Sequence, residues 1–190
     1  MIKDNKKIIF FDGDGTIWYP KKTKRKVSPH WIYSNKKTKK DCLRQLELVP
    51  GVIKILKKIK QNNIALILLS THPTDLKNAQ QLLKEKIEYF NLQNLFNECF
   101  ATQGHHESKG EFILKILKNK KIPKSKALMI GDSYHYDYLS AKKINVDSLL
   151  IKTPYTKKPI RGKIIKNMIS KEDMIVLKVF RTLGIRPVLE

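Results

Sequence analysis

Two aspartates stand two residues apart in the segment Asp12-Gly13-Asp14-Gly15-Thr16. The apolar run before it, Lys7–Phe11, is predicted to be a strand, and the glycines allow a sharp turn after it. Carboxylates this close repel each other unless a cation lies between them, and Mg²⁺ prefers oxygen ligands. An acidic turn without chemistry is the alternative, but this pattern directly after a strand favours a functional site.

Two further polar segments follow predicted secondary-structure signals. Ser70 and Thr71 end the apolar run Ile64–Leu69. Hydroxyls there can bind a phosphate oxygen, although a helix cap is the commoner reason for them. Lys109 follows the helix-capping residue Ser108, where a cation opposes the helix dipole unless an anion faces it. A solvated lysine is the alternative at this position.

A second acidic pair follows the fourth predicted strand. Gly131-Asp132-Ser133 comes directly after the apolar run 127–130, and Asp137 lies five residues beyond Asp132. These carboxylates could complete an oxygen shell for Mg²⁺, whereas an ordinary turn and helix cap would also account for Gly-Asp-Ser. Open α/β sheets place their sites at the carboxyl ends of strands, so all four segments are expected at one edge.

The order and spacing of these segments resemble the haloacid dehalogenase superfamily over about residues 7–151. The matching positions are Asp12–Thr16 for the first motif, Ser70 for the second, Lys109 for the third, and Gly131-Asp132 with Asp137 for the fourth. Trp18-Tyr19-Pro20 also resembles the magnesium-dependent phosphatase-1 branch of that family, although Gly15 stands where the branch tends to carry Tyr. The second aspartate, Asp14, is typical of the family's phosphatases and phosphotransferases.

The resemblance implies a Mg²⁺-dependent phosphatase that works through an aspartyl phosphate. Asp12 would be the nucleophile, and Asp14 the acid for the leaving oxygen and then the base for water. For both steps the pKa of Asp14 should lie near the working pH. The remaining implied roles are phosphate binding by Ser70, Thr71 and Lys109, and metal binding by Asp12, Asp14 through its backbone carbonyl, Asp132 and Asp137.

Apolar runs alternate with segments of helical period along the chain, which predicts an α/β fold with a parallel sheet. The five expected strands are Lys7–Phe11, Ile64–Leu69, Glu98–Ala101, Ala127–Ile130 and Ser148–Ile151. Expected helices follow Pro50, Pro73 and Ser108 and cover Tyr138–Ile144, and the apolar stripe of the second is Leu76, Ala79, Leu82, Leu83 and Ile87. The resemblance implies a three-layer Rossmann-like fold with strand order 5-4-1-2-3, helices on both faces and no large cap.

We expect a catalytic domain over residues 1–152, followed by a C-terminal extension over 153–190 with one amphipathic helix, Ser170–Leu183. Residues 17–49 are too short and too polar for a typical helical cap and are interpreted as a flap, with scattered anchors at Val27, Trp31, Ile32 and Tyr33. Trp18 and Trp31 could stack on a base or sugar, or pack the flap onto the domain. His72, His105 and His106 are interpreted as polar loop residues.

The charge is strongly basic, with 39 Lys+Arg against 17 Asp+Glu and a formal net charge of +22. Only five of these cations are arginines, the residue best suited to phosphates and base edges, so nucleic-acid binding is not favoured. Phosphorylated substrates, small or macromolecular, are the expected partners. A nucleic-acid-end phosphatase and a basic nucleic-acid-binding protein with a degenerate site are the alternatives.

Hydrophobic residues make up 41% of the chain, which excludes intrinsic disorder, and the longest apolar run is far too short to cross a membrane. Two cysteines, Cys42 and Cys99, are too few for a disulfide framework. We therefore expect a cytoplasmic enzyme without a membrane partner.

Overall fold

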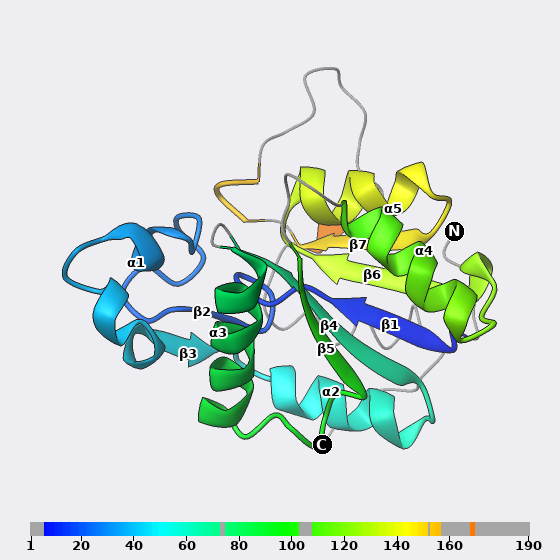
Figure 1. The fold of residues 1–190 in the computed structure, drawn as a ribbon, viewed down its shortest axis with the longest axis horizontal. Coiled ribbons are helices and arrows are strands. Elements are labelled where there is room, and N and C mark those ends of the chain that lie inside the picture. Colours follow the sequence, from blue (N-terminus) through cyan, green and yellow to red (C-terminus); the bar gives the residue numbers. More distant parts are fainter. Residues whose placement is uncertain (1–5, 73–74, 103–107, 152, 157–167, 170–190) are drawn as a thin grey trace.

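A computed structural model describes residues 6–72, 75–102, 108–151, 153–156 and 168–169. Its centre is a parallel sheet with the order β5-β4-β1-β6-β7-β8 (Figure 1). The strands are β1 Ile8–Phe11, β4 Ala65–Thr71, β5 Glu98–Thr102, β6 Ala127–Gly131, β7 Asp147–Ile151 and β8 Met168–Ile169. In chain order, the five expected strands are β1, β4, β5, β6 and β7. Numbered one to five and read across the sheet from β7 to β5, they lie in the order 5-4-1-2-3, so the predicted order is confirmed. The short β8 adds a sixth strand, from the segment expected to be a separate extension.

Helices cover both faces of the sheet (Figure 1). The covering helices are α2 Val52–Gln61 and α3 Leu76–Tyr89 on one face, and α4 Lys109–Asn119 and α5 Ser140–Lys143 on the other. Ile9 and Phe11 of β1 belong to the core under α2 and α3, whereas Ile8 and Phe10 belong to the core under α4 and α5. All four side chains of β1 are fully or almost fully buried, and each contributes roughly 1.5–3 kcal/mol to stability. The strand that precedes Asp12 is therefore firmly anchored.

The helices begin close to where the sequence predicts them. The helical period of Val52, Ile55, Leu56 and Ile59 predicts the buried face of α2, and all four are buried. On α3 the prediction is partly wrong: Leu76, in the first turn, is half exposed, and the buried face includes Lys86 instead. The last expected helix is also different, because a π-helix over Tyr134–Leu139 precedes the short α5.

The flap between β1 and α2 has more structure than expected. It contains an antiparallel pair, β2 Trp18–Pro20 and β3 Leu46–Leu48, with the short helix α1 Trp31–Ser34 and 3-10 turns Lys39–Asp41 and Leu43–Gln45 between them. Of the four expected anchors, Ile32 is fully buried, Trp31 and Tyr33 are partly buried against the core, and Val27 is 44% exposed. Trp18 and Tyr19, at the start of the flap, are also buried. The helix expected over Ser170–Leu183 lies outside the described residues.

Candidate active site

Asp12 follows β1 directly and meets a lysine from the other side of the site. Ser108 caps α4 as predicted and forms a capping box with Glu111, so that the helix starts at Lys109. From this fixed position the Lys109 ammonium donates hydrogen bonds to Asp12 Oδ1 and, at 2.7 Å, to Asp137 Oδ1. Although burial alone would lower it, the two carboxylates hold the pKa of Lys109 above its ordinary value. Lys109 is thus a buried cation, and the anion expected to face it is a pair of carboxylates.

Three carboxylates converge in front of Lys109. Oxygens of Asp12, Asp132 and Asp137 all lie within 4.8 Å of one another, and all three residues are buried. Burial, together with the neighbouring carboxylates, raises the pKa of Asp132 well above its ordinary value and that of Asp137 to about 6. A hard divalent cation would remove this repulsion, so the donor set fits Mg²⁺.

Two glycines allow the carboxylates to come this close. Gly15 has a φ of +86°, and a Cβ there would lie 2.1 Å from Asp132 Oδ2. A Cβ on Gly131 would lie 2.1 Å from Asp137 Oδ2. Any side chain at either position would displace a carboxylate of the cluster. The backbone N–H of Ser133 then fixes Asp137, donating to its Oδ2 at 2.9 Å.

Asp14 lines the same cavity as Asp12, but its carboxylate is bound by side chains of the flap and of α3. Its Oδ1 accepts hydrogen bonds from Trp18 Nε1 at 2.9 Å and from the Tyr33 hydroxyl, and its Oδ2 accepts one from Lys86 Nζ at 2.9 Å. Burial favours the neutral acid, but Lys86, His30 and Tyr33 together outweigh it and lower the pKa of Asp14. The expectation of a pKa near the working pH is therefore wrong for this arrangement, because a buried lysine stabilises the carboxylate.

The two hydroxyl residues after β4 are placed differently from each other. Thr71 lines the cavity, and its hydroxyl pairs with that of Thr102 at 2.9 Å. Ser70 does not line the cavity but lies against the loop that carries the aspartates, where its Oγ would be 2.8 Å from a Cβ on Gly13. Their roles in phosphate binding stay predictions.

Several residues near the carboxylates were not predicted. The Tyr155 hydroxyl donates to Asp132 Oδ2, and Thr156 lies beside it, beyond the domain boundary expected at residue 152. No pattern in the sequence marks Tyr155. Lys86 did leave a signal, because it is a lysine three residues after Leu83 on the apolar stripe of α3.

The histidines and tryptophans also have definite places. His72 lies in the loop after β4, as expected, but it is buried, and its ring contacts that of Tyr33 edge to face. His105 and His106 lie outside the described residues. Trp18 is fully buried and stacked on Phe90, so it packs the flap onto the domain. Trp31 is partly buried and donates to the Thr23 hydroxyl.

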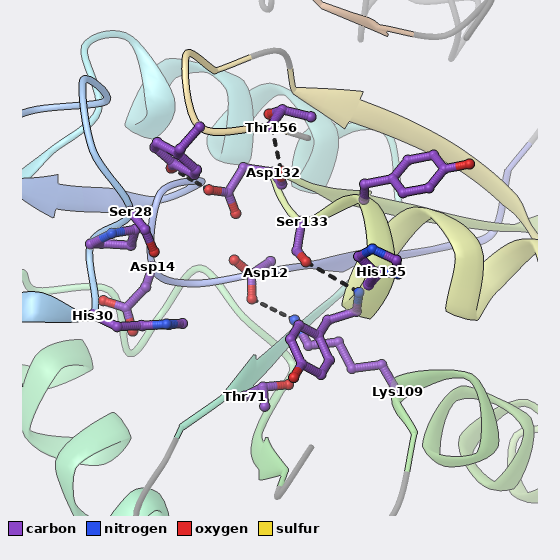
Figure 2. A pocket seen from close by; sticks show the side chains of 14 residues that line it. Asp12, Asp14, Ser28, His30, Thr71, Lys109, Asp132, Ser133, His135 and Thr156 are labelled. Atoms are coloured by element: carbon purple, nitrogen blue, oxygen red, sulfur yellow. Dashed lines mark hydrogen bonds and ion pairs between the residues drawn. The ribbon is translucent and has the colours of Figure 1, made fainter. Parts of the chain in front are cut away.

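The cavity in front of these groups has a volume of about 380 Å³. Figure 2 shows Asp12 near the middle of the labelled side chains, with Asp132 on one side and Lys109 on the other. Carboxylate, ammonium and hydroxyl groups thus meet at the carboxyl edge of the sheet. An oxygen nucleophile beside a cation and a hard-metal donor set can attack a phosphorus centre.

A family model for haloacid dehalogenase-like hydrolases matches residues 4–151. The chain belongs to this family. The match covers the whole sheet except β8 and all the sequence-predicted site residues. The finer assignment to the magnesium-dependent phosphatase-1 branch stays a prediction.

One relative by sequence is named after a phosphate-releasing activity. The chain is 27% identical over 111 residues to PpaX of Caldanaerobacter subterraneus subsp. tengcongensis, which is named as a pyrophosphatase. The matched region is 57% of this chain and 47% of that protein, so the chain spans about half the length of this relative.

Solved structures share the fold at low identity. A structure from Clostridium acetobutylicum described as a predicted phosphatase has a TM-score of 0.67 at 16% identity, covering 94% of this chain and 100% of that one. A haloacid dehalogenase-like hydrolase from Xanthomonas campestris has a TM-score of 0.63 at 16% identity, covering 96% and 98%. At these identities the likeness establishes the fold alone. Among the described residues, no helix is long and apolar enough to span a membrane.

Proposed function

We propose that this protein is a Mg²⁺-dependent phosphomonoester hydrolase with Asp12 as its nucleophile. The observation that carries the proposal is the cluster of Asp12, Asp132 and Asp137 around the buried ammonium of Lys109. Asp12 lies at the end of a fully buried strand, which limits the movement of the attacking oxygen. The proposed catalytic domain is residues 1–152, with residues 17–49 as a flap.

In the first step, Asp12 attacks the phosphorus atom, and the bond to the leaving oxygen breaks. The phosphoryl group passes to Asp12, and Lys109 stabilises the negative charge on its oxygens. Asp12, Asp132, Asp137 and the backbone carbonyl of Asp14 would hold Mg²⁺, which supplies further positive charge when bound. In the second step, water hydrolyses the aspartyl phosphate and frees Asp12.

Asp14 is the proposed acid in the first step and base in the second. In the structure it is stabilised as a carboxylate, the form that accepts a proton from water. To donate a proton to the leaving oxygen it must first take one up and loosen its contact with Lys86. The acid step is therefore the more demanding of the two.

The decisive test is the substitution Asp12→Asn. We expect it to abolish Mg²⁺-dependent hydrolysis of aryl and alkyl phosphates, because the amide is a poor nucleophile. Asp147→Asn is the matched control: Asp147 also pairs with a buried lysine, Lys6, but at the start of β7, the opposite edge of the sheet. That variant should keep its activity.

Acid-quenched wild-type reactions should contain a phosphoryl group on the peptide that includes Asp12, detected by mass spectrometry. Full activity of Asp12→Asn would contradict the proposal.

A further inference from the structure

Five aromatic rings line the cavity that holds Asp12. They come from three separate segments: the flap, the π-helix after β6, and the turn after β7. We call this set the aromatic rim: His30, Tyr134, His135, Tyr136 and Tyr155. The volume of about 380 Å³ is at the lower end of the range for small-molecule sites. The rings thus contribute much of the wall that a leaving group would contact.

Three rings of the rim have contacts that fix them before any ligand arrives. Tyr134 stacks on Tyr138 with centroids 5.7 Å apart and planes at 16°, and it meets the His135 ring edge to face. Tyr155 is fixed by its hydrogen bond to Asp132. Rings that are already ordered lose little conformational entropy when another ring stacks on them.

Tyr136 is the rim residue with the least structural reason to be aromatic. Its backbone N–H bonds to Ser133 Oγ at 3.1 Å, which fixes the start of the π-helix, while the residue remains 44% exposed. A π-helical turn is found frequently at functional sites. An exposed ring in the wall of a cavity is suited to contact a ligand rather than the core.

The charges around the cavity restrict the ligand further. Of the described residues that line it, Lys109 is the only lysine or arginine, and its ammonium already binds Asp12 and Asp137. A leaving group with a carboxylate or second phosphate of its own would therefore find no free lysine or arginine among these lining residues, whereas an uncharged leaving group needs none.

We propose that the site selects phosphate monoesters whose leaving group carries a flat, uncharged ring, which stacks on the aromatic rim. The inference rests on the proposed phosphatase function and adds the substrate class. Stacking of a ring on aromatic side chains tolerates many ring types, so the selection is for a flat ring near the phosphate rather than for one base. Nucleoside 5′-monophosphates and arylmethyl phosphates both have this chemistry.

The experiment compares two pairs of esters with the same kind of leaving oxygen. Adenosine 5′-monophosphate is paired with ribose 5-phosphate, which lacks the base. Benzyl phosphate is paired with cyclohexylmethyl phosphate, whose ring is puckered. The bond that breaks is to a primary alkoxide in all four, so a difference in kcat/KM within a pair reports the flat ring.

We expect kcat/KM to favour the flat-ring ester at least about fivefold in one or both pairs, as stacking on aromatic side chains implies. The pair that shows the larger ratio indicates how far the ring stands from the phosphate. Tyr136→Ala should bring the ratio close to one. The matched control is Tyr89→Ala on α3, which removes a tyrosine of the same 44% exposure and should keep the wild-type ratio.

Ratios near one in both pairs for the wild-type enzyme would overturn ring selection, as would a ratio that survives the double substitution Tyr134→Ala, Tyr136→Ala. In that case, Asp12-dependent hydrolysis of all four esters would leave the phosphatase proposal standing. Failure of the wild-type enzyme to hydrolyse any of the four through Asp12 would overturn both proposals.

Discussion

Two aspartates from one short loop each pair with a buried lysine, yet their surroundings are opposite. Asp12 binds Lys109 within the carboxylate cluster, and we call these two residues the front pair. Asp14 binds Lys86 on the side of the flap and α3, and we call these two the back pair. The side chains of both lysines are only 2% exposed. The front lysine faces a cluster of three carboxylates, whereas the back lysine faces one carboxylate and lies over the rings of Trp18 and Tyr33, at 5.4 and 4.5 Å from their centroids.

The difference in charge balance explains the difference in expected function. At the front, negative charge exceeds positive charge, and burial together with the neighbouring carboxylates raises the pKa values of Asp132 and Asp137. Such a cluster favours binding of a further cation. At the back, one ammonium balances one carboxylate between aromatic rings. In the proposed mechanism, the back pair therefore positions Asp14, while the front pair takes part in the chemistry.

The comparison predicts that the two lysines differ most in their effect on phosphoryl transfer. Lys109→Met removes positive charge next to the reacting oxygens and should lower kcat by about 10²–10³-fold for any phosphate ester, as loss of one charge-stabilising donor does. Lys86→Met acts through Asp14 alone: it removes a hydrogen bond that positions the carboxylate and the charge that lowers its pKa. The rate should therefore change more for alkyl phosphates, which need a proton on the leaving oxygen, than for 4-nitrophenyl phosphate, which does not.

Steady-state rates of both variants on both esters test this difference. An equal loss on the two esters in Lys86→Met would show that Lys86 does not act through Asp14. Lys86→Arg keeps the charge and should restore part of the alkyl-phosphate rate if positioning of Asp14 is the reason for the loss.

Stability is the second way to separate the pairs. Lys86→Met leaves the buried carboxylate of Asp14 without its cation, and breaking one partner of such a pair costs about 3–5 kcal/mol in the free energy of unfolding. The further substitution Asp14→Asn removes the unpaired charge, so the double variant should regain part of that loss. Urea denaturation of the four proteins completes the double-mutant cycle. Additive losses would contradict direct coupling of the two side chains.

Metal binding should act on the front cluster alone. At a Mg²⁺ concentration of 100 times the Kd, binding to the folded protein adds about 2.7 kcal/mol to its stability. We expect Mg²⁺ to raise the Tm of the wild-type protein and of Lys86→Met, but not of Asp132→Asn. Thermal denaturation with Mg²⁺ and with a chelator measures both shifts without an activity assay. A full shift in Asp132→Asn would exclude this carboxylate as a ligand.

The sequence predicts the front of the site far better than the back. Asp12, Asp132 and Asp137 follow strands that apolar runs identify, and parallel strands bring their carboxyl ends to one edge. The capping box at Ser108 and Glu111 likewise locates the start of α4. These features depend on local patterns, which a single sequence contains.

The back of the site depends on contacts between distant residues. Lys86 meets Asp14 across 72 positions of the chain, and Tyr33 comes from a flap whose sequence has no regular period. Tyr155 reaches Asp132 from beyond the last expected strand. Hydrophobic periodicity says nothing about such partners, which explains why the pKa of Asp14 was predicted wrongly. Among these partners, only Lys86 has a sequence signal, because a lysine on the apolar stripe of α3 indicates a buried ion pair.

The smallest expected effect concerns His72, which lies beside the back pair. Burial, and the nearby positive charge of Lys86, lower its pKa to about 4, although Asp14 acts in the opposite direction. The folded protein thus holds His72 neutral at pH values where the unfolded chain, with a pKa near 6.5, takes up a proton. Stability should therefore fall as the pH decreases from about 6.5 to about 4.

His72→Phe removes this proton uptake and keeps a ring against Tyr33. The loss of stability between pH 7 and pH 5 should then be smaller than in the wild-type protein by about 1–2 kcal/mol, which urea denaturation at the two pH values measures. In Lys86→Met the loss attributable to His72 should also shrink, because a positive charge that lowers the pKa of His72 is gone. An identical pH dependence in wild type and His72→Phe would mean that the region behind Asp14 admits water and accepts the charged imidazole, and the contrast between a closed back pair and a reactive front pair would no longer hold.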